Sequence, residues 1–244
     1  FPGMEFTVAR HVFEPGDCLV GFTDGTTDAR SAAGAHFTEE RFIGSLAYPW
    51  SSVFSMLFEV DLEIRRHIGD EPQFDDITLI ALRRSLDPEA ESRHAICREA
   101  RPEILPELRE FVESAARYCR LMDDDVFAFK SSADEVCTNI VQHGFADREP
   151  GMLSLTFTVE PAAYARLVIS DDGAHFPPDQ APAPDLDADV HDREEGGLGL
   201  YLVRAQMDRV TYTRADSSRN ELVLERDLIS SKTMEGVQNE DHES

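Results

Sequence analysis

Apolar residues recur at helical or strand spacing along most of the chain, with two exceptions. Residues 85–92 are polar, include a proline and show no apolar period, which is typical of a linker. Residues 230–244 are also polar and aperiodic, so we expect a disordered tail there. The pattern therefore predicts one domain over residues 1–84 and a second over residues 93–229.

In the first segment, two short apolar runs predict strands over residues 18–23 and 77–82. The second run lacks polar alternation and predicts a buried strand. Residues 51–68 repeat apolar side chains at helical spacing and predict an amphipathic helix.

The second segment alternates strands and helices. A helix is predicted from Pro102, since proline suits a first turn, and another over residues 124–143, capped by one of the aspartates 123–125. A third helix is predicted over residues 198–207. Strands are predicted over residues 94–98, 153–160, 165–170, 209–213 and 221–226. A sheet with its helices on one face would bury these apolar stripes, which is an α+β fold.

Charge and composition narrow the classes of function. Among 244 residues, 48 are acidic and 23 basic, so the net charge is −25, and no basic patch offsets it. Nucleic acid would be repelled by such a chain. The sequence contains no run of 18 apolar residues, so it predicts no membrane span. The four cysteines form no Cys-x-x-Cys pair, so we expect reduced thiols and a cytoplasmic protein. The chain starts at Phe1 without a leader, and we expect it to be a piece of a longer protein.

Three short elements of the second segment suggest chemistry. The first places Glu135, Asn139 and His143 four residues apart, along one helix face. The glutamate could serve as a general base, and the asparagine carbonyl could bind a hard cation such as Mg²⁺. A solvated helix face explains the same spacing and is the better interpretation of this element alone.

The second element ends an apolar strand with Asp171 and places Gly173 two residues later. A carboxylate at a strand end can accept a hydrogen bond from an exocyclic amine such as that of adenine, and glycine lets a ring approach the backbone. An ordinary Asp-Gly turn is the simpler explanation when this element is taken alone.

The third element runs Gly196-Gly197-Leu198-Gly199 into an apolar helix. Exposed backbone N–H groups and a helix N-terminus together can hold phosphate, and Arg193 is the nearest cationic side chain. Many glycine-rich turns bind nothing, so this element is weak evidence by itself.

In this order, the three elements resemble the anti-sigma-factor serine kinases of the GHKL ATPase superfamily, over residues 93–228. The resemblance implies a GHKL (Bergerat) α/β sandwich that binds ATP and Mg²⁺. It assigns Glu135 as the base that activates a substrate serine, Asn139 as the Mg²⁺ ligand and Asp171 as the adenine contact. His143, Gly173, Arg193 and residues 196–199 would also contact the cofactor. The implied substrate is a STAS-type anti-anti-sigma protein, with a sigma factor as a further partner. Family members often dimerise, which leaves a homodimer open.

Two features depart from this family. His175 stands where the family has a second glycine, and the loop over residues 174–195 is acidic. They favour an alternative in which the domain is a non-catalytic binder that sequesters a sigma factor or a STAS protein. A histidine kinase is disfavoured, because His94 falls in a predicted strand and His67 in the first segment.

The acids of the first segment allow two interpretations. Asp24 follows one predicted strand, and Asp75 and Asp76 precede the other. Carboxylates at strand ends can gather cations that activate water, but spacing alone favours ordinary turn acids. The segments Thr23-Asp24-Gly25 and Asp75-Asp76-Ile77-Thr78 resemble the C-terminal part of the PPM serine/threonine phosphatases, a β-sandwich family. That resemblance implies Mn²⁺ or Mg²⁺ ligands at Asp24 and Asp75. The family's earlier half has no counterpart here, so we expect no phosphatase activity from this chain.

Overall fold

The computed structural model describes residues 9–85, 93–146, 148–160, 163–175, 198–214 and 219–228. The chain divides into two compact units, residues 1–91 and 92–244. The predicted tail and most of the predicted linker lie outside the described residues. Within the described ranges, no helix is both long enough and apolar enough to cross a membrane.

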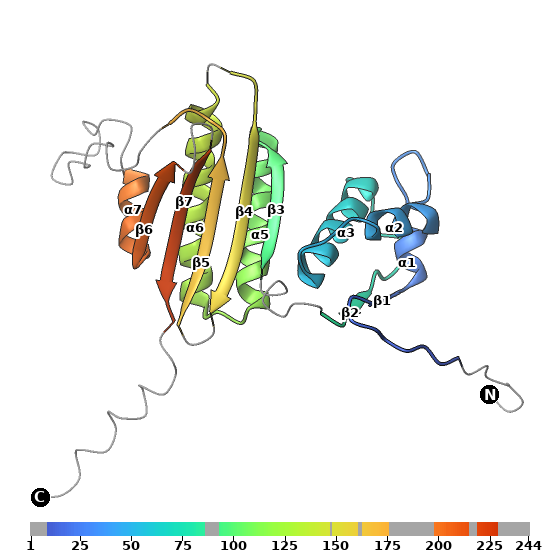
Figure 1. Cartoon of the computed structure of the whole chain (residues 1–244). Helices are drawn as coiled ribbons and strands as arrows, with labels where there is room; N and C mark the ends of the chain where they lie inside the picture. Colours follow the sequence, from blue (N-terminus) through green and yellow to red (C-terminus); the bar gives the residue numbers. More distant parts are fainter. Residues whose placement is uncertain are drawn as a thin grey trace, which may run out of the picture. The chain divides into compact units, whose positions relative to one another are not determined.

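The first unit joins a two-stranded antiparallel sheet to three helices (Figure 1). Its strands are β1 (Cys18–Phe22) and β2 (Leu79–Arg83), and its helices are α1 (Asp24–Thr27), α2 (Glu39–Leu46) and α3 (Val53–Ile68). Phe37, Phe42 and Ile64 are fully buried at its centre, and the inner faces of the strands pack against them. The predicted first strand and helix are thus confirmed.

The prediction of a buried second strand is wrong. Side chains of β2 alternate between two faces, and Ile80 and Leu82 are 68% and 61% exposed. Only the face that bears Leu79 packs on the core. The aspartates lie on the predicted sides of the two strands: Asp24 follows β1 as the first residue of α1, and Asp76 comes three residues before β2.

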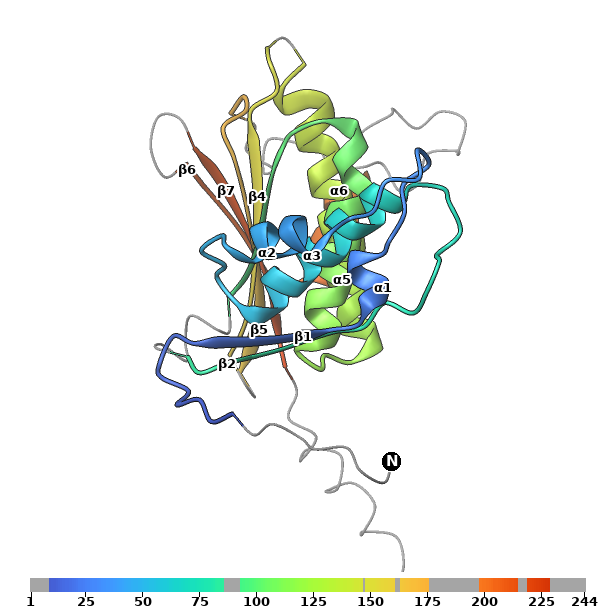
Figure 2. The ribbon, with the colours of Figure 1, turned by 90° about the vertical axis from the view of Figure 1, so that its right-hand side faces the viewer.

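The second unit is a five-stranded antiparallel sheet with the strand order β3-β4-β5-β7-β6. The helices cover one face of this sheet, as Figure 1 shows from the strand side and Figure 2 nearly edge-on. The predicted one-sided assembly is therefore confirmed. The strands are β3 (His94–Glu99), β4 (Met152–Glu160), β5 (Tyr164–Asp171), β6 (Arg209–Arg214) and β7 (Asn220–Asp227).

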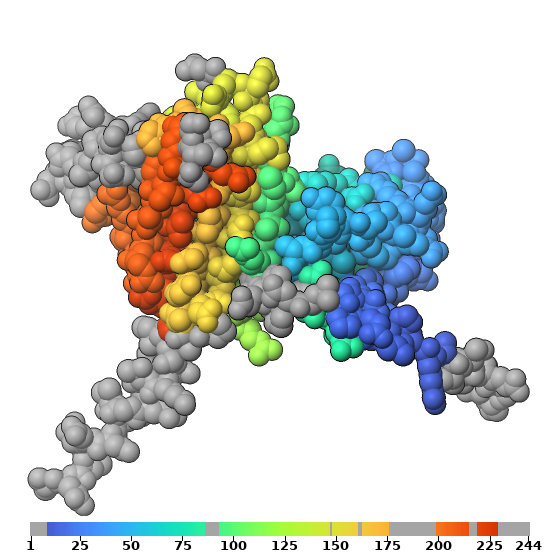
Figure 3. Space-filling model, in the orientation of Figure 1, coloured from blue at the N-terminus to red at the C-terminus, as the bar shows by residue number. Residues whose placement is uncertain are grey.

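Alternation along the strands explains the one-sided packing. Leu155, Phe157, Leu167 and Ile169 point to the helices and are fully buried, and the Phe157 ring packs edge-on against Phe129. The outer face carries polar, charged and β-branched side chains instead, among them the paired Arg166 and Glu225. Figure 3 shows this outer face, where the atoms of β4 to β7 lie side by side.

The helices follow the predicted order, with corrections at their ends. A 3₁₀ turn (η1, Pro102–Ile104) precedes α5 (Leu105–Tyr118), and α7 spans Leu198–Gln206. The helix α6 (Asp123–Asn139) is preceded by Met122 as its N-cap, so the prediction of an aspartate cap is wrong. Its three opening aspartates instead lie in the first turn, where negative charge complements the helix dipole.

The second helix was predicted to continue to residue 143, but its α-helical part ends at Asn139. From there the chain forms one π-helical turn, η2 (Ile140–Gly144). Such turns are rare and often occur at functional sites.

Candidate active site

The helices α6 and α7 meet at the Glu135 carboxylate. Asn139 donates its side-chain amide to Glu135 Oε1 at 2.7 Å, one helical turn away. A Cβ atom added to Gly199 would overlap with that carboxylate, so the first turn of α7 approaches closely only because residue 199 has no side chain. Both polar side chains are half-buried, so this helix face is not simply solvated.

The end of η2 meets the segment that follows β5. Ala174 donates its backbone N–H to the Gly144 carbonyl oxygen at 2.8 Å. A Cβ atom on Gly173 would lie 3.0 Å from that oxygen and 2.8 Å from Asp171 Oδ1. Gly173 is therefore required by close backbone approach, and the first and second sequence elements adjoin.

Asp171 is the buried carboxylate of this site, with 7% of its surface exposed. Its Oδ1 accepts from the Gly173 backbone N–H at 2.8 Å and from the Asn220 amide at 2.9 Å. Burial raises the pKa of Asp171 above its ordinary value, and these two hydrogen bonds partly oppose that rise. Among the described residues none donates to Oδ2, which leaves that oxygen as an acceptor for a ligand.

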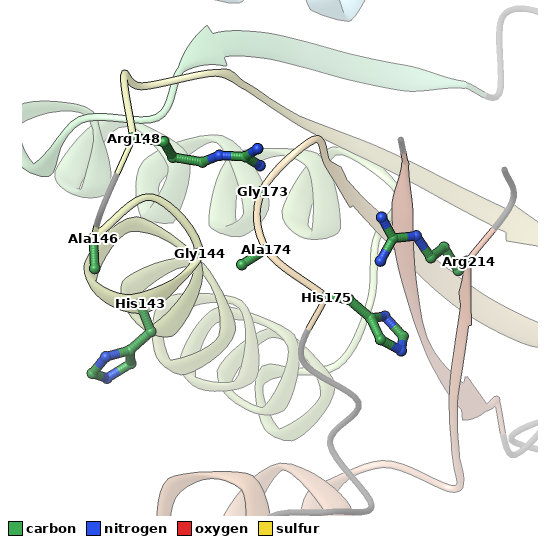
Figure 4. A pocket seen from close by; sticks show the side chains of 8 residues that line it. All are labelled: His143, Gly144, Ala146, Arg148, Gly173, Ala174, His175 and Arg214. Atoms are coloured by element: carbon green, nitrogen blue, oxygen red, sulfur yellow. The ribbon is translucent and has the colours of Figure 1, made fainter. Parts of the chain in front are cut away.

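A pocket of about 310 Å³ opens beside this segment (Figure 4). Its lining combines small residues with four basic side chains, which are unusual neighbours in a chain of net charge −25. The lining consists of His143, Gly144, Ala146, Arg148, Gly173, Ala174, His175 and Arg214. A pocket of this size suits part of a small molecule.

Two residues of this site were missed from the sequence. Asn220 Nδ2 also lies 3.3 Å from the Gly173 carbonyl and 3.2 Å from the Ala174 carbonyl, and Asn220 Oδ1 accepts from the Tyr212 hydroxyl at 3.0 Å. That hydroxyl is 2.8 Å from His175 Nδ1. Asn220 and Tyr212 follow no recognisable spacing in the sequence. Strand register places Asn220 beside Asp171, and Tyr212 reaches that site through Asn220.

Part of the predicted phosphate-binding element, namely Arg193, Gly196 and Gly197, lies outside the described residues. Leu198 is described only as the first residue of α7. Gly199 is the member of that element that the structure brings to Glu135.

In the first unit, the two acidic segments adjoin. Thr23 donates its hydroxyl to the Asp76 carbonyl at 2.7 Å, and the backbone of Gly25 packs closely against that of Asp76. Asp24 and Asp75 are exposed. Within the described ranges, no three acidic, histidine or cysteine side chains are grouped as a metal site would require.

Comparisons with known proteins agree with this division. Residues 98–226 match the family of histidine kinase-like ATPase domains, and residues 1–85 match stage II sporulation protein E. The chain belongs to the histidine kinase-like ATPase family. The family implies ATP and a divalent metal in general terms, and the sporulation protein match covers the part with phosphatase resemblance.

Named relatives match each unit separately. Protein IcfG of Synechocystis is 38% identical over 84 residues, which are 34% of this chain and 13% of that protein. Serine/threonine-protein kinase BtrW of Bordetella bronchiseptica is 37% identical over 90 residues, 37% of this chain and 63% of the relative. Serine-protein kinase RsbW of Bacillus velezensis is 33% identical over 115 residues, 46% of this chain and 71% of the relative. The chain thus spans less than two thirds of the first two.

A solved structure matches across both units. The RsbU and RsbW domains of a Mycobacterium tuberculosis protein align with 88% of this chain and 53% of that one, at 17% identity and a TM-score of 0.41.

The residues present fit the ligands of an ATPase of this family. The Asn139 amide nitrogen is engaged by Glu135, so its oxygen is left as a hard ligand of the type that Mg²⁺ prefers. Mg²⁺ commonly takes few protein ligands and several from phosphate and water, so a single amide oxygen would be enough to hold it. Asp171 Oδ2 and the bare backbone of Gly173 fit a flat ring that carries an amine.

Proposed function

We propose that the second unit binds ATP with Mg²⁺ and transfers the γ-phosphoryl group to a serine of a STAS-type anti-anti-sigma protein. The observation that carries this proposal is the approach of Gly199 to Glu135, beside Asn139. It brings together a carboxylate, an amide side chain and the first turn of a helix, the groups that the proposal needs. The names of the BtrW and RsbW relatives support serine as the acceptor.

In the proposed reaction, Asp171 holds the adenine amine and Asn139 holds the cation. The serine Oγ forms a bond to the γ-phosphorus, the bond from that phosphorus to the β,γ-bridging oxygen breaks, and ADP leaves. Glu135 receives the serine proton, and Asn139 orients its carboxylate by donating to Oε1. Mg²⁺ would supply charge neutralisation on the phosphates.

The test is phosphoryl transfer from labelled ATP to a purified STAS protein. We expect Asn139→Ala to abolish transfer, by at least about 100-fold, because positioning and charge neutralisation provide most of the catalysis. Its thermal unfolding should match the parent. Glu59→Ala, on α3 of the first unit, is the control and should retain transfer.

Retained transfer by Asn139→Ala would contradict the assigned role. Tight binding of the STAS protein without any transfer by the parent chain would favour the sequestering alternative, in which His175 has replaced the family glycine at the cost of catalysis.

A further inference from the structure

We propose that His175, Tyr212 and Asn220 form a positioning chain that presents Asp171 to the base of the nucleotide and makes the pocket select an amine at the purine 6-position. This inference rests on the proposed binding of ATP. It concerns residues that depart from the family pattern or lie outside its motifs, and it gives His175 a role in place of the missing glycine.

The directions of the hydrogen bonds are fixed by the atoms that meet. Asn220 Nδ2 faces three oxygen acceptors, on Asp171, Gly173 and Ala174, so its amide nitrogen must point there. Asn220 Oδ1 then accepts from the single hydroxyl hydrogen of Tyr212. That hydroxyl must accept from His175, so His175 Nδ1 carries a hydrogen. All donors in the chain point toward Asp171.

Strand register builds this chain. Asn220 pairs directly with Asp171 across β5 and β7, and Arg214 of the pocket pairs with Asn220 across β6 and β7. Tyr212 lies two residues before Arg214, on the same face of β6. The His175 ring lies 5.5 Å from the Tyr212 ring, so packing supports the hydrogen bond.

These hydrogen bonds fix the orientation of the Asp171 carboxylate. With Gly173 and Asn220 both donating to Oδ1, the Asp171 group cannot rotate freely and its Oδ2 is held as the free acceptor. Donors to a buried carboxylate also favour its ionised form. An oxygen acceptor held in this way favours an exocyclic amine on the purine and disfavours a carbonyl at that position, because two facing acceptors cannot form a hydrogen bond.

The positioning chain also holds in place the backbone segment that lines the pocket. Asn220 reaches the Gly173 and Ala174 carbonyls, and Ala174 is tied to Gly144. A site that is ordered before the ligand arrives loses less entropy on binding. Removing the Tyr212 hydroxyl should therefore both weaken binding and reduce base selection.

The experiment measures equilibrium binding of Mg-ATP and Mg-ITP to the full chain. ITP has a carbonyl where ATP has the amine. Tyr212→Phe keeps the ring beside His175 and removes only the hydroxyl. We expect its affinity for ATP to fall about five- to tenfold, and its preference for ATP over ITP to fall by a similar factor, as for loss of one hydrogen bond. His175→Gly should act in the same direction, and the double variant should be no worse than Tyr212→Phe.

Tyr164→Phe is the matched control, since this tyrosine lies at the other end of β5. It should leave affinity and selection unchanged. If Tyr212→Phe behaves like Tyr164→Phe while the parent binds ATP, the positioning chain is refuted and the proposed function stands. If the parent binds neither nucleotide, the proposed function fails, and the positioning chain fails with it. The ratio of the two affinities separates positioning from general loss of stability, which would weaken both nucleotides equally.

Discussion

Asp171 is a buried carboxyl group at the proposed binding site, and its burial has a cost in stability. Its carboxylate is buried, so its pKa in the folded chain lies above the ordinary value of 3.8. The folded state therefore holds this proton more tightly than the unfolded state does. Stability is highest below 3.8, where both states are protonated, and it falls as the pH rises through the raised value. At neutral pH the burial of this carboxyl group therefore costs the fold free energy.

Replacing this residue with an amide should reverse the trade. In Asp171→Asn, the oxygen can still accept from Gly173 and Asn220, and the amide nitrogen takes the Oδ2 position without a charge. We expect the melting temperature at pH 7.5 to equal or exceed that of the parent by about 2–4 °C, the shift that 1 kcal/mol produces at this size. ATP affinity should fall about 100-fold, because a donor would face the adenine amine.

Thermal unfolding from pH 3 to pH 8 checks this prediction. The difference between Asp171→Asn and the parent should vanish toward pH 3, where Asp171 is protonated. Asp70→Asn provides a control at an exposed residue of the first unit, which is not among the charges that act on Asp171, and it should show no such pH-dependent gain. A variant Asp171→Asn that is destabilised at pH 7.5 would show that the ionised carboxylate stabilises the fold.

At the scale of elements, the approach of α7 to α6 decides whether the site is assembled. The far end of α7 is held by the Gln206 side chain, which accepts from Ser131 at 2.6 Å, and by the Gln206 carbonyl, which accepts from Arg226 at 2.6 Å. Arg226 also reaches Asp125 on α6 at 2.7 Å. These contacts hold α7 against α6 at that end and favour the close approach of Gly199 to Glu135 at the other.

A methyl group at residue 199 should therefore damage transfer more than stability. In Gly199→Ala, the new Cβ must displace either the Glu135 carboxylate or the first turn of α7. Alanine favours a helix by up to about 1 kcal/mol over glycine, which offsets part of the strain. We expect phosphoryl transfer to fall about 10- to 100-fold, as for loss of a positioned general base, with a small change in melting temperature.

Gly44→Ala is the matched control, because Gly44 also lies inside a helix and a Cβ there meets nothing within 4 Å. It should raise stability slightly, by about 0.5–1 kcal/mol, and leave transfer unchanged. Equal transfer by both variants would mean that Gly199 can move away from Glu135 without consequence.

Elements were predicted well where burial follows a simple period. The spacing of apolar residues predicted α3 and β5 to within two residues at each end, and the three motifs predicted that Glu135, Asp171 and Gly199 belong to one unit. The exposed face of β2 was not predicted, since a continuous apolar run does not reveal which side chains find a partner. The contacts of Asn220 were not predicted either, because they depend on strand register and not on any local pattern.

At the scale of the whole molecule, net charge works against the proposed ligand. The chain has a net charge of −25, whereas the basic side chains that line the pocket act only at short range. An anion approaching from solvent meets a repulsive long-range field before it meets His143, Arg148, His175 and Arg214. Salt screens the long-range repulsion more strongly than the short-range attraction inside the pocket, because screening increases with distance.

This predicts an unusual salt dependence for association with Mg-ATP. The screening length falls from about 30 Å at 0.01 M salt to about 8 Å at 0.15 M, so added salt should remove most of the long-range repulsion and leave contacts inside the pocket. We expect the association rate constant to rise about two- to fivefold over this range, opposite to the behaviour of a basic binding protein. Stopped-flow measurements at constant free Mg²⁺ check it. Uncharged adenosine is the control, and its rate should not change with salt. A rate for Mg-ATP that falls with salt would show that the four basic side chains outweigh the field of the rest of the chain.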